Sequence, residues 1–440
     1  MRLGLDSLDG SQVGRVGALI VLVVGLCCAL QAAALYGMGR RRPVGDEVDY
    51  LANARSREPL APGKFLRPPA LPLLAAWCCR LGRGDDSVRV VMSAASVLTV
   101  AFTTASALQL GGATMALAAA LLLTAQPERM VLGCHVWPDT LIALVLAAQM
   151  WILTVALPGN AGLVVGAILA TVGVLVRIDF VIAVPLFALA WHAEHGGATV
   201  LPVLVLVGGP LSALALLTAH NHRRYGRALP DDTWAFNLMV MSQSARASAV
   251  GSHLIEPVVT KTEQEWLGLS GAERSRRALG ALKDAAGSPG SLLRGLGRRI
   301  LTLLGPDRFV SQMLLPTHRA YPELAGDWRG RLEFWLKWAF PALVALGVVT
   351  SLAGLRPASA YLWPSLGLAF ALVMSHTRTR YRVALLPAMS LVAAEGIDRG
   401  VRMLADHPVT VALVGVATLG LAAALSRVPS VEEIRQDVGE

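Results

Sequence analysis

Acidic side chains are scarce in this sequence. Its 440 residues contain 30 Asp and Glu against 39 Lys and Arg, and charged residues make up 16% of the chain while hydrophobic residues make up 54%. A mean hydropathy of +0.55, with repeated apolar runs of about 18 residues or more, excludes an ordinary soluble domain. These runs are continuous rather than alternating, which disfavours a transmembrane β-barrel. The composition indicates a polytopic membrane protein.

Cysteine is also rare, and its spacing is uninformative. There are five cysteines, an odd number, and no C-x-x-C motif, which supports neither a disulfide framework nor a zinc site. No nucleic-acid-binding motif accompanies the net charge of +9, so we expect no nucleic-acid partner. The basic residues beside the apolar runs are expected to meet the phosphates of the lipid bilayer.

The apolar runs predict an all-α polytopic membrane protein with about 11 transmembrane helices. The predicted spans are 16–37, 88–110, 112–126, 138–157, 161–177, 179–193, 198–219, 334–354, 358–376, 380–397 and 408–425. The first run is longer than the apolar core of a signal peptide, so we expect an uncleaved helix there.

The spans divide the chain into three predicted parts. Residues 1–219 form an N-terminal transmembrane core of about seven spans, with a polar first loop at 38–86. Residues 220–333 form one large soluble insert. Its end, 291–304, has the pattern of a basic interfacial helix or of an ordinary amphipathic helix packed on the insert. Residues 334–440 form a C-terminal segment of about four spans and a charged tail.

Three of the scarce carboxylates stand together in the first loop, as Asp46, Glu47 and Asp49. In a helix, residues three and four apart share a face, so Asp46, Asp49, Tyr50 and Asn53 would form one polar stripe. Such a stripe could hold a hydroxyl substrate while one carboxylate takes its proton. The alternative is a capping box, in which Asp46 and Asp49 bind backbone N–H groups at a helix start.

Several other ionisable residues are predicted to lie on the same membrane face, because an odd number of spans precedes each. Glu128, His135 and Asp139 follow the third span and could approach Asp46, although Asp139 after a proline is also a candidate helix cap. Arg177 and Asp179 lie between two apolar runs, where ionisable residues serve function or pair with each other.

A late arginine cluster lies on this face as well. Arg378, Arg380 and Arg382 flank Tyr381 between two spans. Guanidinium groups bind phosphate oxygens in bidentate fashion, which makes the cluster a candidate phosphate site. Snorkelling of these side chains to the membrane surface is the alternative.

The order of these features resembles the GT-C superfold of glycosyltransferases that use polyprenyl-phosphate sugars, with the protein O-mannosyltransferases and the lipid A aminoarabinose transferases as the nearest families. The matching elements are the Asp46-Glu47 pair, the segment from Arg67 to Leu74, Pro138-Asp139, the insert beginning near Asn221 with Arg224-Tyr225-Gly226, and Arg380-Tyr381-Arg382 with Pro387. Each motif is short, and their order and membrane placement supply the specificity.

The resemblance implies an inverting transfer of a sugar from a polyprenyl-phosphate donor to a glycan, lipid or protein acceptor. Its candidate catalytic residues are Asp46 and Glu47. The resemblance and the charge pattern together give candidates for binding the substrate or the donor phosphate: Lys64, Arg67, Asp139, Arg378, Arg380, Tyr381 and Arg382. A divalent metal, Mg or Mn, held by Asp46, Glu47 or Asp139 is compatible with this scheme but is not required by it.

The resemblance also implies a multi-pass protein of the plasma (inner) membrane whose active site faces outside the cytoplasm. The nine Lys and Arg residues of loop 38–86 favour the opposite orientation by the positive-inside rule. Two other functions remain open: a transporter or lipid flippase of the cell envelope, and a non-enzymatic envelope assembly protein.

Overall fold

The structure is a computed structural model of the 440-residue chain. It describes residues 10–37, 43, 45–61, 65–82, 84–155, 160–195, 201–233, 236, 263–286, 300, 303–306, 310, 327–352, 359–374, 379–404 and 406–428. The candidate phosphate-binding residues Lys64 and Arg378 lie outside this set, as does most of the predicted interfacial helix at 291–304.

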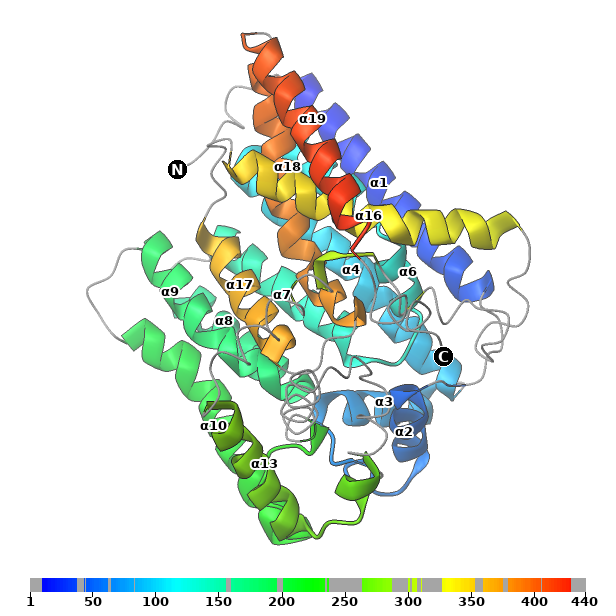
Figure 1. Ribbon diagram of the computed structural model, residues 1–440, viewed down its shortest axis with the longest axis vertical. Coiled ribbons are helices and arrows are strands. Elements are labelled where there is room, and N and C mark those ends of the chain that lie inside the picture. The colour runs from blue at the N-terminus through cyan, green and yellow to red at the C-terminus, as the bar shows by residue number, and fades with distance from the viewer. Residues whose placement is uncertain are drawn as a thin grey trace.

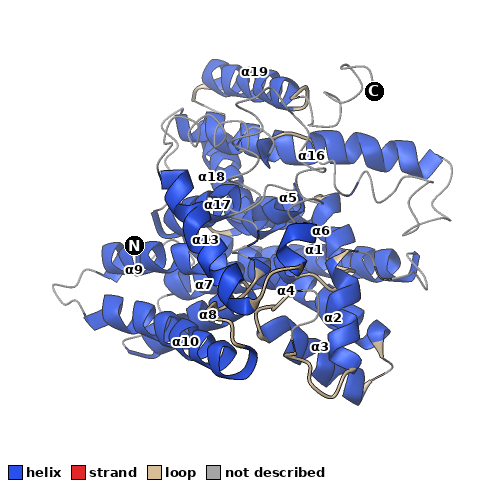
Figure 2. Ribbon diagram, turned by 60° about the horizontal axis from the view of Figure 1, so that its bottom comes forward, coloured by secondary structure: helices blue, strands red, loops and turns tan. Residues whose placement is uncertain are grey.

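The described residues fold into helices and contain no strand (Figures 1 and 2). The first half comprises α1 (Gly10–Gly37), α2 (Asp46–Arg55), α3 (Ala70–Leu81), α4 (Asp85–Gly111), α5 (Ala113–Thr124), α6 (Pro127–Leu132), α7 (Pro138–Val155), α8 (Asn160–Val176), the 3₁₀-helix η1 (Ile178–Ile182) and α9 (Val184–His195). The second half comprises α10 (Leu201–Tyr225), α13 (Gly271–Ala286), α16 (Asp327–Leu352), α17 (Ser359–Met374), the 3₁₀-helix η2 (Thr379–Leu385), α18 (Leu386–Met403) and α19 (Pro408–Leu425).

Each predicted span contains a helix, which confirms the all-α polytopic membrane fold. Among the described residues, five helices are long and apolar enough to cross a membrane on their own: Gly17–Gly37, Asp85–Gly111, Leu201–Tyr225, Phe334–Leu352 and Pro408–Leu425. The remaining apolar helices are shorter, so the count of eleven spans stays a prediction. The short apolar piece of the first loop forms α3, a helix too short to span, as expected.

Two predicted spans begin differently from the prediction. The span expected at 179–193 starts with η1, and the span expected at 380–397 starts with η2. In both cases a proline is the second residue of the α-helix that follows, Pro185 in α9 and Pro387 in α18. Proline suits the first turn of an α-helix because the N–H groups there have no hydrogen-bond partner within the helix. The missing N–H of proline therefore costs no hydrogen bond. The residues before it wind as a tighter 3₁₀ turn.

Helices at the periphery present apolar side chains outward. On α19, Leu413 is 65% exposed and Leu419 is 73% exposed. In a soluble protein such a face would need a covering partner, whereas in a bilayer lipid tails cover it. Helix α19 packs against α16, and α10 packs against α8 and α9 (Figure 1).

Helices α4 and α7 pack together at the centre of the bundle. Helix α4 buries a series of hydroxyl side chains, and each donates to a backbone carbonyl four residues earlier in its own helix. These residues are Thr99, Thr103, Thr104 and Ser106. The hydroxyls are thereby hydrogen-bonded within their own helix, and their small size lets the helices approach closely.

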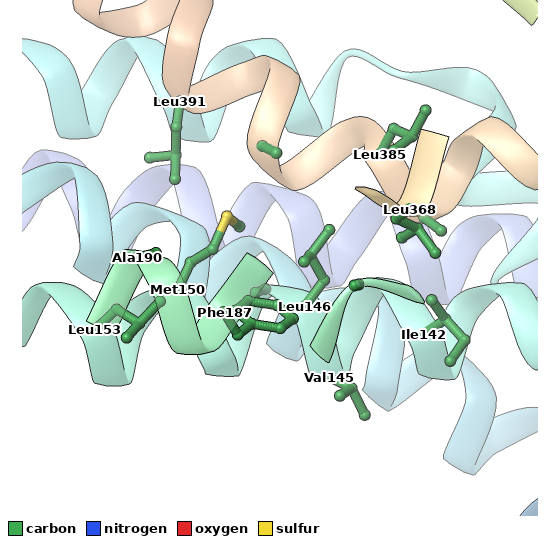
Figure 3. Packing of buried hydrophobic residues seen from close by; sticks show 14 of the residues in the cluster. Ile142, Val145, Leu146, Met150, Leu153, Phe187, Ala190, Leu368, Leu385 and Leu391 are labelled. Atoms are coloured by element: carbon green, nitrogen blue, oxygen red, sulfur yellow. The ribbon is translucent and has the colours of Figure 1, made fainter. Parts of the chain in front are cut away.

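The main hydrophobic core joins α7 to the elements that carry the late arginines. Figure 3 shows Leu146 and Met150 of α7 lying near Phe187 of α9, and Leu385 of η2 lying above Ile142 of α7. All of these residues belong to one buried cluster. The packing fixes η2 and α9 relative to α7, and so fixes the polar residues at their ends.

The polar elements gather at one end of the molecule. Helices α2 and α3 of the first loop, the end of α10, and α13 of the insert lie together at the bottom of Figure 1. The end of α10 extends beyond the predicted span and carries Arg224 and Tyr225 to this region. There Arg224 pairs with Glu58, and the Tyr225 hydroxyl donates to the carbonyl of Leu60 at 3.2 Å.

Candidate active site

Asp46 opens α2 and lies between two arginines. Gly45, at φ 55°, makes the turn into the helix in a conformation that favours glycine. The N-cap residue, Gly45, has no side chain with which to cap the helix. The Asp46 carboxylate accepts a hydrogen bond from Arg67 at 3.0 Å on one oxygen and from Arg380 at 2.6 Å on the other.

The contacts of Asp46 extend into a series of alternating charges, which we call the charge chain. In order of contact it comprises Asp49, Arg67, Asp46, Arg380, Asp139, Arg177 and Asp179. Arg177 donates to Asp139 at 2.8 Å, and Nε of Arg380 lies 3.9 Å from the other Asp139 oxygen. The loops that were predicted to lie on one membrane face thus contact one another in the structure.

The two partly exposed carboxylates of the charge chain lie at one end of it. The side chains of Asp46 and Asp49 are 30% and 27% exposed, whereas that of Asp139 is 1% exposed. Arg67 and Arg380 are buried. A molecule from outside therefore meets the Asp46 end of the charge chain first, with the arginines already in place behind it.

Aromatic rings hold the arginines of the charge chain in position. The Arg67 guanidinium lies 5.2 Å from the ring centre of Tyr50 and 5.3 Å from that of Phe65. The ring of Tyr381 lies between two guanidiniums, 4.5 Å from Arg177 and 5.0 Å from Arg380. These cation–π contacts are strong where water is excluded, so the positions of the cations are fixed before any substrate binds.

The protonation states follow from the same neighbours. Burial acts to lower the pKa of Arg67, but Asp46, Tyr50 and Asp49 together outweigh it, and the pKa lies above its ordinary value. Burial raises the pKa of Tyr50 to about 12. Arg67 therefore stays charged and Tyr50 stays neutral at physiological pH.

Glu47, the residue after Asp46, is fully buried and has other partners. It accepts from Arg89 of α4 at 3.2 Å and from the backbone N–H of Val136 at 3.4 Å, and it lies 3.3 Å from Nδ1 of His135. The His135 ring stacks on Trp137 at 4.3 Å. Glu47 thus connects α2 to α4 and to the loop before α7.

Arg382 and Glu128 form a separate buried pair. Both Glu128 oxygens accept from Arg382, one of them at 2.6 Å from Nε, and both side chains are fully buried. The Arg382 guanidinium also donates to the backbone carbonyls of Leu303 and Gly305 and lies 4.3 Å from the ring of Phe340. All of its nitrogens have protein partners, so this geometry favours a structural role over phosphate binding.

The geometry does not fit a divalent metal at the predicted ligands. Within the described ranges, no group of three or more His, Cys, Asp and Glu side chains is arranged to hold a metal ion. Asp46 and Asp139 both face Arg380, so a guanidinium stands between two of the three candidate ligands.

Two contributors to the site escape the sequence analysis. Arg89 lies in a predicted span and binds Glu47. The sequence feature that could have identified it is an ionisable residue within an apolar segment. Trp137 lies under Arg380 at 5.2 Å and joins it to His135. Nothing in the sequence distinguishes Trp137 from the other tryptophans of the chain.

Comparison with known proteins finds a family match close to the N-terminal half of the chain. Residues 66–221 match the family model described as dolichyl-phosphate-mannose-protein mannosyltransferase. The matched segment includes Arg67, Asp139 and Arg177 but neither Asp46 nor Arg380. It confirms the predicted resemblance to GT-C glycosyltransferases for these residues. Among curated proteins, none matches the chain at a significant level.

Solved structures with a similar course of the chain are distant. The apo oligosaccharyltransferase of Archaeoglobus fulgidus shares 13% identity at a TM-score of 0.44, with 92% of this chain and 55% of that chain covered. ArnT from Cupriavidus metallidurans bound to undecaprenyl phosphate shares 15% identity at a TM-score of 0.37, with coverages of 88% and 79%. The chain thus spans about half the length of the archaeal enzyme.

Proposed function

We propose that this chain is an integral membrane glycosyltransferase. It moves a sugar from a polyprenyl-phosphate donor to an acceptor hydroxyl on the outer side of the plasma membrane. The observation that carries the proposal is the placement of Asp46, a partly exposed carboxylate held between two buried guanidiniums at the rim of the charge chain. The family match over residues 66–221 supports the reaction class.

Asp46 is the base in this proposal. Its carboxylate takes the proton of the acceptor hydroxyl as that oxygen forms a bond to the anomeric carbon of the sugar. The bond from the anomeric carbon to the phosphate oxygen breaks at the same time, and the polyprenyl phosphate leaves with the electron pair. Because one displacement occurs, the anomeric configuration is inverted.

Arg380 and Arg67 supply the positive charge that this step needs. Negative charge develops on the leaving phosphate, and preorganised cations stabilise it. Arg380 stands between Asp46 and Asp139, and a donor phosphate entering at the exposed Asp46 end competes for it. A carboxylate that loses a neighbouring cation becomes a better base, so donor binding would activate Asp46.

Three of the other predicted site residues, Glu47, Tyr381 and Arg382, have supporting roles in this proposal. Glu47 positions α2, because its partners are Arg89 and the loop before α7. Tyr381 spaces Arg177 from Arg380, while Arg382 fixes η2 to α6 and to residues 303–305. Lys64 and Arg378 remain candidate donor-binding residues.

The sugar-transfer proposal is tested with a donor panel. Purified protein in lipid nanodiscs is incubated with polyprenyl phosphates carrying radiolabelled hexoses or pentoses and with envelope fractions as the source of acceptor. The expected result is label in an envelope product together with free polyprenyl phosphate. Movement of intact labelled lipid across proteoliposomes, with no release of polyprenyl phosphate from any donor, would instead show a transporter or flippase.

The orientation is tested separately with a cysteine at Val48, which is 49% exposed on α2. A membrane-impermeant thiol reagent is applied to intact cells that express Val48→Cys in a chain lacking its native cysteines. We expect labelling without permeabilisation. Labelling only after permeabilisation would place the site in the cytoplasm, as the positive-inside rule favours.

A further inference from the structure

One of the contacts between the insert and the first loop is made by a buried carboxylate, that of Asp232. This side chain is fully buried, and one of its oxygens accepts from the backbone N–H of Leu66 at 3.1 Å. In return the Leu66 carbonyl accepts the backbone N–H of Asp232 at 2.9 Å. Residues 166 positions apart therefore hold each other by two reciprocal hydrogen bonds.

Two arginines of the insert converge on the same carboxylate. Arg227 and Arg274 both donate to the Asp232 oxygen that binds Leu66, Arg274 at 2.8 Å. Two guanidinium groups that donate to one buried carboxylate fix its direction. We call this set, Asp232 with Arg227 and Arg274, the insert latch.

Aromatic contacts extend the insert latch to the residue before Leu66. The ring of Phe65 lies 5.2 Å from that of Phe236, and Phe236 lies 6.3 Å from Trp266. The Arg274 guanidinium lies 5.5 Å from the Trp266 ring, so the aromatic and ionic contacts form one unit. Residues 65 and 66 are thereby held on the side of the insert.

The next residue along the chain is Arg67, which donates to Asp46 and Asp49. Its guanidinium also stacks on Phe65. The backbone bond at Leu66 and the ring of Phe65 thus support Arg67, beside the ring of Tyr50, and both are held by the insert. A shift of the insert latch would move Arg67 relative to Asp46.

We infer that Asp232 is a positioning residue for the transfer reaction: it holds Arg67 against Asp46 and so couples the state of the insert to the reactivity of the base. This inference rests on the proposed function. Asp232 itself touches neither Asp46 nor Arg380 among its described contacts and lies in the insert. Its effect on transfer is exerted through Arg67.

The test uses Asp232→Asn, which keeps the size of the side chain and removes its charge. Hydrogen–deuterium exchange of the peptide that contains residues 65–67 is compared with the wild type. We expect exchange at Leu66 to rise by about tenfold or more, because the local opening free energy falls. The control Glu58→Gln removes an exposed ion pair between the same two segments and is expected to leave exchange unchanged.

The transfer assay provides a readout that simple destabilisation would not move. Arg67 favours the ionised form of Asp46, so its displacement should shift the acid limb of the pH–rate profile to higher pH, by about one unit. In an Arg67→Gln background, Asp232→Asn should have little further effect, since residues that act through one another are not additive. Equal losses in both backgrounds, or an unchanged acid limb, would overturn the inference.

Arg274→Gln is the second variant, used if Asp232→Asn does not fold. It weakens the insert latch from the insert side and leaves the bond from Asp232 to Leu66. We expect the same two changes at smaller size, and unchanged exchange at residues 65–67 would overturn the inference. Exchange is measured without substrate, so absence of transfer by the wild type would refute the proposed function while this measurement still decides the role of the insert latch.

Discussion

The buried pair of Glu128 and Arg382 gives a stability prediction that does not depend on the reaction. Glu128→Gln removes the negative charge and leaves a guanidinium that is fully buried. Breaking a buried ion pair by removing one partner costs about 3–5 kcal/mol. With an unfolding entropy of about 2.1 cal/mol/K per residue over 440 residues, the melting temperature should fall by about 3–5 °C.

The assay is thermal unfolding in detergent, monitored by intrinsic tryptophan fluorescence. The matched control is Glu395→Gln, which breaks a pair four residues apart on α18 whose arginine, Arg399, is 39% exposed. Such pairs contribute about 0.3–0.5 kcal/mol, so this control should be close to wild type. Glu128→Met with Arg382→Met should lose less stability than Glu128→Gln, because no charge remains buried. A Glu128→Gln variant as stable as the control would refute the reasoning.

Other predictions concern the charge chain. Arg380→Gln should weaken the binding of undecaprenyl phosphate in nanodiscs by about 10-fold or more, since a hydrogen bond to a charged group contributes about 1.5–3 kcal/mol; unchanged affinity would remove Arg380 from the donor site. Tyr50→Phe should retain most transfer activity and the same pH–rate profile up to pH 10, because the pKa of Tyr50 is raised to about 12 and the hydroxyl is neutral in that range. A basic limb below pH 10 that disappears in Tyr50→Phe would contradict this.

The positions of the helices could be predicted from the sequence. Long apolar runs predict the positions of the helices because only structures with internally satisfied backbone hydrogen bonds can span lipid, and the scarcity of acidic residues singles out Asp46. The hydropathy pattern does not predict the 3₁₀ turns η1 and η2. Arg177 adjoins apolar residues and Arg380 stands beside the next apolar run, and only the proline after each turn signals where the α-helix begins.

The pairing within the site is less accessible from the sequence. Arg380 and Arg382 look equivalent as neighbours in one motif, yet Arg380 meets Asp46 while Arg382 meets Glu128. The winding of η2 decides which side chain faces which partner, and that winding depends on packing in the main core. The contact between Asp232 and Leu66 joins segments 166 residues apart, and no local pattern encodes it.

The most direct test of the account compares Asp46→Asn with Asp49→Asn. Both carboxylates lie on α2, bind Arg67 and are similarly exposed, but in the structure Asp46 also binds Arg380. Transfer from the polyprenyl-phosphate donor and binding of undecaprenyl phosphate are measured for each variant. We expect Asp46→Asn to lose transfer by about 10²–10⁴-fold while it still binds the lipid, and we expect Asp49→Asn to keep most activity. Near-wild-type transfer by Asp46→Asn would contradict the assignment of Asp46 as the base.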